Sequence, residues 1–68
     1  MKQYQQRMIN EYNDLNIKIE KLDKLINNIK NGTSYIKLKY PIELLEAQLR
    51  AMQQYSLCLN KRIKAEEI

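Results

Sequence analysis

The sequence contains no histidine, tryptophan or phenylalanine, and its only cysteine is Cys58. Without histidine it lacks the usual general base of Ser-His and Cys-His catalytic triads. A lone cysteine cannot form an intrachain disulfide, and without histidine it does not make a zinc site. These absences exclude disulfide-stapled folds and histidine-dependent catalysis. The sequence therefore predicts no metal, no cofactor and no enzymatic activity.

Glycine and proline also occur only once each, and both lie in the middle of the chain. A single glycine excludes a glycine-rich phosphate-binding loop. Gly32 after Asn31 predicts a helix end with glycine in the left-handed conformation. Pro41 predicts the first position of a second helix. The residues between them, 33–40, alternate apolar side chains with lysine and are predicted to form an extended connection.

Long apolar runs are absent as well. No stretch approaches the length of a membrane span, and the residues after Met1 are too polar for the core of a signal peptide. A single reduced cysteine fits a cytoplasmic protein. We therefore expect no membrane association and a location in the cytoplasm.

What the sequence does contain is heptad spacing of apolar residues on both sides of the connection. It predicts helices over about 2–30 and 41–66, joined by the connection 31–40, in one helical-hairpin domain over 1–68. The two columns of the first helix are Met1, Met8, Leu15, Leu22 and Ile29, and Gln5, Tyr12, Ile19 and Ile26. The two columns of the second helix are Leu45, Met52 and Leu59, and Ile42, Leu49, Ser56 and Ile63.

The two sets of columns match each other when the chain is folded back on itself. Met8 then faces Ile63, Ile26 faces Leu45, and the residue numbers of every facing pair sum to 71. A single register thus satisfies the whole seam. The predicted fold class is all-α, an antiparallel two-helix hairpin.

The apolar surface is wider than one seam needs. The second helix has a further stripe, and the first helix has apolar residues beside its seam. Exposed apolar surface of this size indicates an interface. We expect a homo-oligomer, at least a dimer that forms a four-helix bundle. The additional residues are Leu44, Ala51, Tyr55 and Cys58, with Tyr4, Ile9, Ile17 and Leu25.

A polar column on this wide face has two interpretations. It consists of Gln48, Tyr55 and Arg62, and the register brings Arg7, Glu11 and Tyr12 near its end. In one interpretation Arg62 pairs with Glu11 at the rim of the bundle and Gln48 hydrogen-bonds across the interface. In the other, tyrosine and arginine line a cleft between protomers that takes a planar anionic ligand, because arginine binds phosphate and tyrosine stacks on a base.

The net charge of +4 is too dilute for a protein dedicated to duplex DNA, and no helix-turn-helix is present. The connection interleaves Tyr35, Lys37, Lys39 and Tyr40, which is a weak signal for a nucleotide or a single strand. The alternative is that the two lysines only keep an extended segment soluble.

Two stretches carry a resemblance to known proteins. The first stretch contains Arg7-Met8-Ile9-Asn10-Glu11-Tyr12, Leu15, Lys18-Ile19 and Lys21-Leu22. The second contains Leu44-Leu45, Gln48-Leu49, Ala51-Met52, Tyr55, Leu59 and Arg62-Ile63. They resemble small phage and prophage proteins related to a crAss-like phage protein, which implies a phage origin. In design the chain is also similar to phage sponges that sequester the cyclic nucleotides of bacterial immune signalling. Because that similarity includes no shared motif, it assigns no binding residue in this chain.

Three hypotheses about function follow. The first is an oligomeric sponge in the host bacterial cytoplasm that holds an anionic nucleotide messenger, of the cyclic oligonucleotide or cyclic ADP-ribose type. The second is an inhibitor or adaptor that docks on a host defence or replication protein through its apolar helix face. The third is a structural accessory of the virion. For the first, the predicted ligand-binding residues are Arg7, Tyr12, Tyr55 and Arg62, with Lys37 and Lys39 as a lid.

Overall fold

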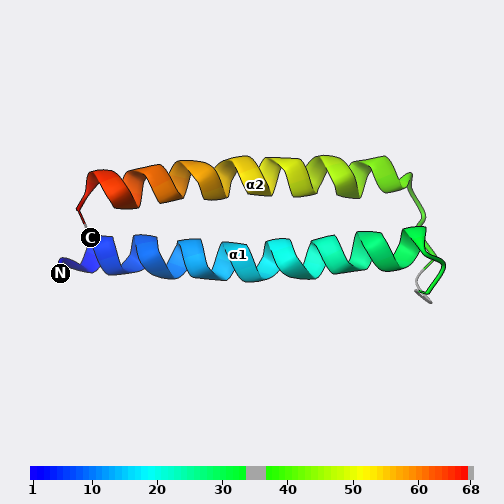
Figure 1. The fold of residues 1–68 in the computed structure, drawn as a ribbon, viewed down its shortest axis with the longest axis horizontal. Coiled ribbons are helices and arrows are strands. Elements are labelled where there is room, and N and C mark those ends of the chain that lie inside the picture. Colours follow the sequence, from blue (N-terminus) through cyan, green and yellow to red (C-terminus); the bar gives the residue numbers. More distant parts are fainter. Residues whose placement is uncertain (34–36, 68) are drawn as a thin grey trace.

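The computed structural model describes residues 1–33 and 37–67. They form two helices, α1 (Gln3–Lys30) and α2 (Ile42–Ala65), and no strand occurs among them. The helices lie side by side and antiparallel in a rod of 45 × 17 × 17 Å, with both termini at one end (Figure 1). The predicted all-α hairpin is confirmed. The expected extended connection over 33–40 falls partly on residues 34–36, which lie outside the described residues.

The core follows the predicted columns. Its buried side chains are Met8, Leu15, Ile26, Leu45 and Leu59. Leu59 is fully buried, and with Met8 and Leu15 it forms a cluster on which further seam residues pack. Those partly buried neighbours are Tyr12, Ile19, Met52 and Ile63.

Hydrogen bonds between the helices fix the register. Ser56 Oγ donates to Asn16 Oδ1 at 2.7 Å, and Asn60 Nδ2 donates to Tyr12 Oη at 3.1 Å. The residue numbers of both pairs sum to 72, within one residue of the predicted register. Each bond joins partly buried groups, whose polar atoms would otherwise lose their hydrogen bonds to water. The seam therefore combines apolar packing with polar pairs that hold the two helices in one alignment.

The end of α1 confirms the predicted role of glycine. Gly32 has φ +72°, and the N–H of Thr33 donates to the carbonyl of Asn28 at 2.9 Å. The N–H of Gly32 donates to the carbonyl of Ile29 at 3.2 Å. These two bonds make a Schellman motif, which satisfies carbonyl groups that a helix end leaves without partners.

Replacing Gly32 with alanine is expected to lower the free energy of unfolding by about 1 kcal/mol, because φ is positive there. A Cβ at this position meets nothing within 4 Å, so backbone strain is the only cost. Asparagine tolerates the left-handed region and should cost less than alanine. Urea unfolding followed by circular dichroism measures both variants. Equal stability of Gly32→Ala and the natural chain would contradict this account.

The start of α2 differs from the prediction by one residue. Pro41 is the N-cap and not the first helical residue, with φ −63° and ψ 143°. The proline ring fixes φ at a helical value but leaves ψ extended here, so the helix begins at Ile42. The carbonyl of Pro41 still accepts the N–H of Leu44 at 3.1 Å.

Polar contacts tie the hairpin together at both ends. At the termini, Tyr4 Oη and Gln5 Nε2 donate to the same oxygen, Glu66 Oε2, at 2.8 and 2.9 Å. At the connection, Lys30 Nζ and Glu46 Oε2 form an ion pair of 2.8 Å. The contacts at the termini join residues more than 60 positions apart in sequence, so they hold the two chain ends together.

The contacts at the termini are expected to depend on pH. The hydrogen bond from Gln5, then that from Tyr4, lowers the pKa of Glu66 below its ordinary 4.5, and Glu66 in turn raises the pKa of Tyr4 above 10.0. Their stabilisation is therefore complete above pH 4.5 and is lost as pH falls through the folded pKa of Glu66. On the alkaline side it is complete below pH 10.0 and is lost as pH rises through the folded pKa of Tyr4.

Tyr4→Phe should move the pKa of Glu66 back towards 4.5, because one of its two hydrogen bonds is removed. An NMR titration of the Glu66 carboxyl carbon measures this change. Tyr40→Phe is the matched control, since Tyr40 is exposed and lies beside α2 at the opposite end of the hairpin. A Glu66 titration that Tyr4→Phe leaves unchanged would show that the contact does not form in solution.

Neither helix is long and apolar enough to cross a membrane, as judged on the residues that the structure describes.

Candidate functional site

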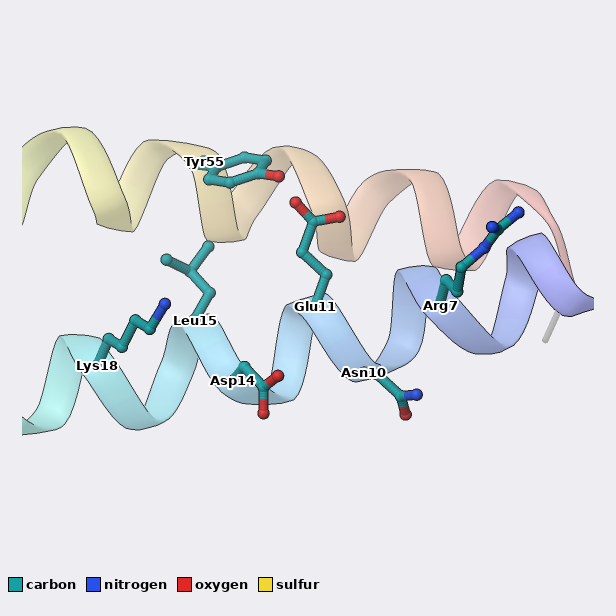
Figure 2. Close-up of a pocket in the computed structure, with 7 residues that line it drawn as sticks. All are labelled: Arg7, Asn10, Glu11, Asp14, Leu15, Lys18 and Tyr55. Atoms are coloured by element: carbon teal, nitrogen blue, oxygen red, sulfur yellow. The ribbon is translucent and has the colours of Figure 1, made fainter.

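A groove of about 380 Å³ lies between the two helices on one face of the hairpin. Tyr55 from α2 covers one side of it, and all the other lining residues come from α1 (Figure 2). The lining residues are Arg7, Asn10, Glu11, Asp14, Leu15, Lys18 and Tyr55.

Helical spacing explains why the α1 residues share this face. The charged residues from Arg7 to Lys18 follow one another in steps of four, three and four, which places them along one side of a helix. Leu15, a buried core residue, forms the apolar floor. The register places Tyr55 at the same level, because its neighbour Ser56 bonds to Asn16.

The charges along the groove are arranged symmetrically. Arg7 and Lys18 lie at its two ends, 11 residues or about 16 Å apart along the helix axis. The carboxylates of Glu11 and Asp14 lie between them. Over residues 1–33 and 37–67 the only ion pair is Lys30–Glu46, so none of these four side chains is neutralised by a direct contact.

This arrangement suits a ligand with both negative charge and a flat ring. A guanidinium donates paired N–H groups to phosphate, and an ammonium adds a point charge. The ring of Tyr55 is 45% exposed and offers a surface for stacking. Ionised carboxylates only accept hydrogen bonds, so Glu11 and Asp14 can receive N–H groups from a base.

Of the residues predicted to bind a ligand, Arg7 and Tyr55 line the groove, Arg7 at one end and Tyr55 near Leu15 (Figure 2). Tyr12 lies at the seam instead, half-buried, with its hydroxyl accepting the hydrogen bond from Asn60. Arg62 is exposed on α2 near the chain ends and does not line the groove. Lys37 and Lys39 are exposed in the connection.

The connection lies at the opposite end of the hairpin from the termini (Figure 1). Lys18, the lining residue nearest to it in sequence, precedes the end of α1 by 12 residues, about 18 Å of helix. Within a single chain, Lys37 and Lys39 therefore lie far from the groove. A lid made by these lysines requires a second chain.

The alternative interpretation of the polar column, with an Arg62–Glu11 ion pair and a hydrogen bond from Gln48 across an interface, does not apply within a single chain. Glu11 and Arg62 make no ion pair in the described part of the molecule, where the only ion pair is Lys30–Glu46. Gln48 Nε2 lies 3.9 Å from Met52 Sδ within its own helix, and Gln48 is exposed. It is therefore accessible to a second molecule.

Sequence reasoning had not selected Asn10, Asp14, Leu15 or Lys18 for the site. The signal that could have found them is the shared stripe from Arg7 to Lys18, which the register places beside Tyr55. Charged residues on a helix surface are ordinarily solvated, so the stripe alone does not distinguish a groove from plain surface. No cluster of three potential metal ligands occurs among the residues that are described.

Comparison with known proteins gives one match. Neither a curated protein nor a solved structure matches the chain. A family model described as Sequestin matches residues 2–65, which include both helices and the connection between them. The relation to a crAss-like phage protein stays a prediction. With nearly its whole length matched, the chain belongs to the Sequestin family.

Proposed function

We propose that this protein is a non-enzymatic phage anti-defence protein that binds and sequesters a nucleotide messenger of bacterial immunity. The messenger is of the cyclic oligonucleotide or cyclic ADP-ribose type, and the protein acts as a homo-oligomer in the host cytoplasm. The family name indicates sequestration. The observation that carries the proposal is the groove, which has a cation at each end, Arg7 and Lys18, and the exposed ring of Tyr55 along its side.

The parts of such a ligand correspond to the parts of the groove. The phosphates fit one cationic end of the groove, at Arg7 or at Lys18, and a base fits the exposed ring of Tyr55. The carboxylates between the two ends accept N–H groups at the edge of the base. A nucleotide with both phosphate and base satisfies all three features, whereas inorganic phosphate satisfies only the first.

Binding without turnover is supported by the composition. The sequence has no histidine to act as a general base near neutral pH, and its single cysteine is not a lining residue of the groove. A protein that only holds its ligand must be present in amounts comparable to that ligand.

Isothermal titration calorimetry against cyclic di- and trinucleotides and cyclic ADP-ribose isomers tests the proposal. We expect saturable binding of at least one of these ligands, and much weaker binding of inorganic phosphate at the same concentration. No binding of any member at about 100 µM, by calorimetry and by thermal shift, would contradict the proposal.

A second candidate is an inhibitor or adaptor that docks on a host defence or replication protein. It is favoured by large apolar side chains on the surface of α2, where Leu44 is 58% and Leu57 is 49% exposed. Affinity capture from the host distinguishes the two functions. One stoichiometric host protein, together with no binding across the nucleotide panel, would favour this candidate over sequestration.

A further inference from the structure

The exposed surface of α2 contains a second heptad stripe that the hairpin does not use. The stripe runs in steps of four and three, which keeps its members on one side of the helix. All of them are exposed, and Tyr55 also borders the groove, so stripe and groove share one face of the hairpin. The stripe consists of Leu44, Gln48, Ala51, Tyr55, Cys58 and Arg62.

The spacing of this stripe is the same when read in either direction. Two copies of α2 can therefore lie antiparallel about a twofold axis with every member facing another member, as an isologous interface requires. Ala51 then faces Tyr55 of the partner subunit, and Gln48 faces Cys58 of the partner subunit. Each large ring meets a small side chain, which is the condition for close packing of two helices.

Charge favours the antiparallel arrangement over the parallel one. The acidic residue of the first turn of α2 is Glu43, and the basic residues near its end include Arg62 and Lys64. Antiparallel pairing brings the acidic start of one helix near the basic end of the other. Parallel pairing would place Arg62 beside Arg62 of the partner subunit, which repels.

The side of the rod is large enough for one stable interface. The hairpin exposes 5510 Å². A compact monomer of 8.2 kDa exposes about 4,500 Å², and the hairpin exposes more because it is a rod of 45 × 17 × 17 Å. A stable interface of standard size buries about 800 Å² on each partner. An interface of that size would cover only a small part of the surface of each hairpin.

The same pairing completes the groove. Along the rod, the partner's α2 starts at the level of Arg7, because the start of one helix faces the end of the other. The connection that precedes α2 carries Lys37 and Lys39, both exposed. They would come to the Arg7 end of the groove and add cations there, while Gln48 of the partner subunit would lie at the level of Glu11 and Asp14.

We propose that two copies of this chain pair antiparallel through the α2 stripe, with Ala51 of each facing Tyr55 of the other, and that each copy closes the groove of its partner. The pairing does not depend on any ligand. The closing of the groove over a nucleotide rests on the proposed function, so the two parts are tested separately.

Disulfide trapping tests the pairing, since Cys58 is the only cysteine and is exposed. In the proposed register Gln48→Cys faces Cys58 of the partner subunit, and mild oxidation should give a covalent dimer on a non-reducing gel. Within one chain these positions are ten residues or about 15 Å apart along the helix, too far for a disulfide. For the same reason Cys58 should not reach its own copy, and the natural chain should stay uncrosslinked.

Gln53→Cys is the matched control, because Gln53 is also exposed but lies on the opposite side of α2 from the stripe. It should crosslink far less than Gln48→Cys. Crosslinking of the natural chain would indicate the parallel arrangement and overturn the proposal. Equal crosslinking of the two variants would overturn it as well, since it would show random collisions.

Ala51→Glu separates the pairing from ligand binding, because Ala51 lies on the stripe but does not line its own groove. By light scattering the natural chain should have twice its 8.2 kDa mass and Ala51→Glu a single mass. Leu57→Glu, an exposed position off the stripe, should stay dimeric. Retained helicity by circular dichroism shows that Ala51→Glu folds, and a folded dimer of that variant would overturn the pairing.

Ligand affinity then tests the closing of the groove. A monomeric Ala51→Glu should bind the nucleotide found in the panel at least about tenfold more weakly than the natural dimer. Equal affinity would overturn the completed groove but leave the pairing intact. If the disulfide-linked Gln48→Cys dimer binds no nucleotide, the proposed function is wrong and the pairing stands.

Discussion

Leu59→Ala is expected to lower the free energy of unfolding by about 2–5 kcal/mol, the cost of removing a large side chain from a packed core. Leu59 is fully buried and packs in one cluster with Met8 and Leu15. A core of this size supplies no more than about 3–5 kcal/mol in total. The variant should therefore be largely unfolded at room temperature, with its helical circular dichroism lost.

Leu57→Ala is the matched control, two residues away on the same helix and 49% exposed. Its cost should stay within about 0.5 kcal/mol, as is usual for surface substitutions. Urea unfolding of the two variants side by side gives the comparison. Similar losses in both would mean that the seam of the hairpin is not where the structure places it.

Arg7→Glu is expected to weaken binding of the nucleotide at least a hundredfold, about 3 kcal/mol, because it replaces charge-assisted hydrogen bonds with repulsion. The acidic side chain would join Glu11 and Asp14, which already line the groove. Calorimetry with the best ligand of the panel measures the loss. The fold should be unaffected, since Arg7 is exposed.

Arg50→Glu makes the same change in charge outside the groove, at an exposed position of α2. It should weaken binding by only about twofold, through the long-range field that salt screens. If both variants lose affinity equally, the effect is one of net charge and the groove is not the binding site. If Arg7→Glu binds like the natural chain, the nucleotide binds elsewhere.

The fold could be predicted because apolar periodicity reports helix faces directly. Met8, Leu15 and Leu59 stand in predicted columns and form the buried cluster. Two complementary sets of columns also determine the register, and the Ser56–Asn16 bond agrees with it to within one residue. The predicted start of α2 was one residue too early, because a proline has the same φ at the N-cap and at the first helical position.

The residues that line the groove could be predicted only in part. Arg7 and Tyr55 were identified because their residue types suit phosphate and base, and the groove contains both. Asp14 and Lys18 were missed because charged residues on a helix surface usually face water. Tyr12 suited a base equally well by type, but its hydroxyl is engaged by Asn60 at the seam. Such pairing depends on packing between helices, which residue type does not report.

A protein that sequesters a nucleotide messenger holds it and releases it unchanged. The direct measurement is to saturate the protein with the best ligand, remove the unbound fraction, denature the protein and identify the released nucleotide by mass spectrometry. For a sequestering protein we expect intact nucleotide in stoichiometric amount, able again to activate its immune effector. Released nucleotide that is cleaved, or no nucleotide retained from any member of the panel, would contradict it.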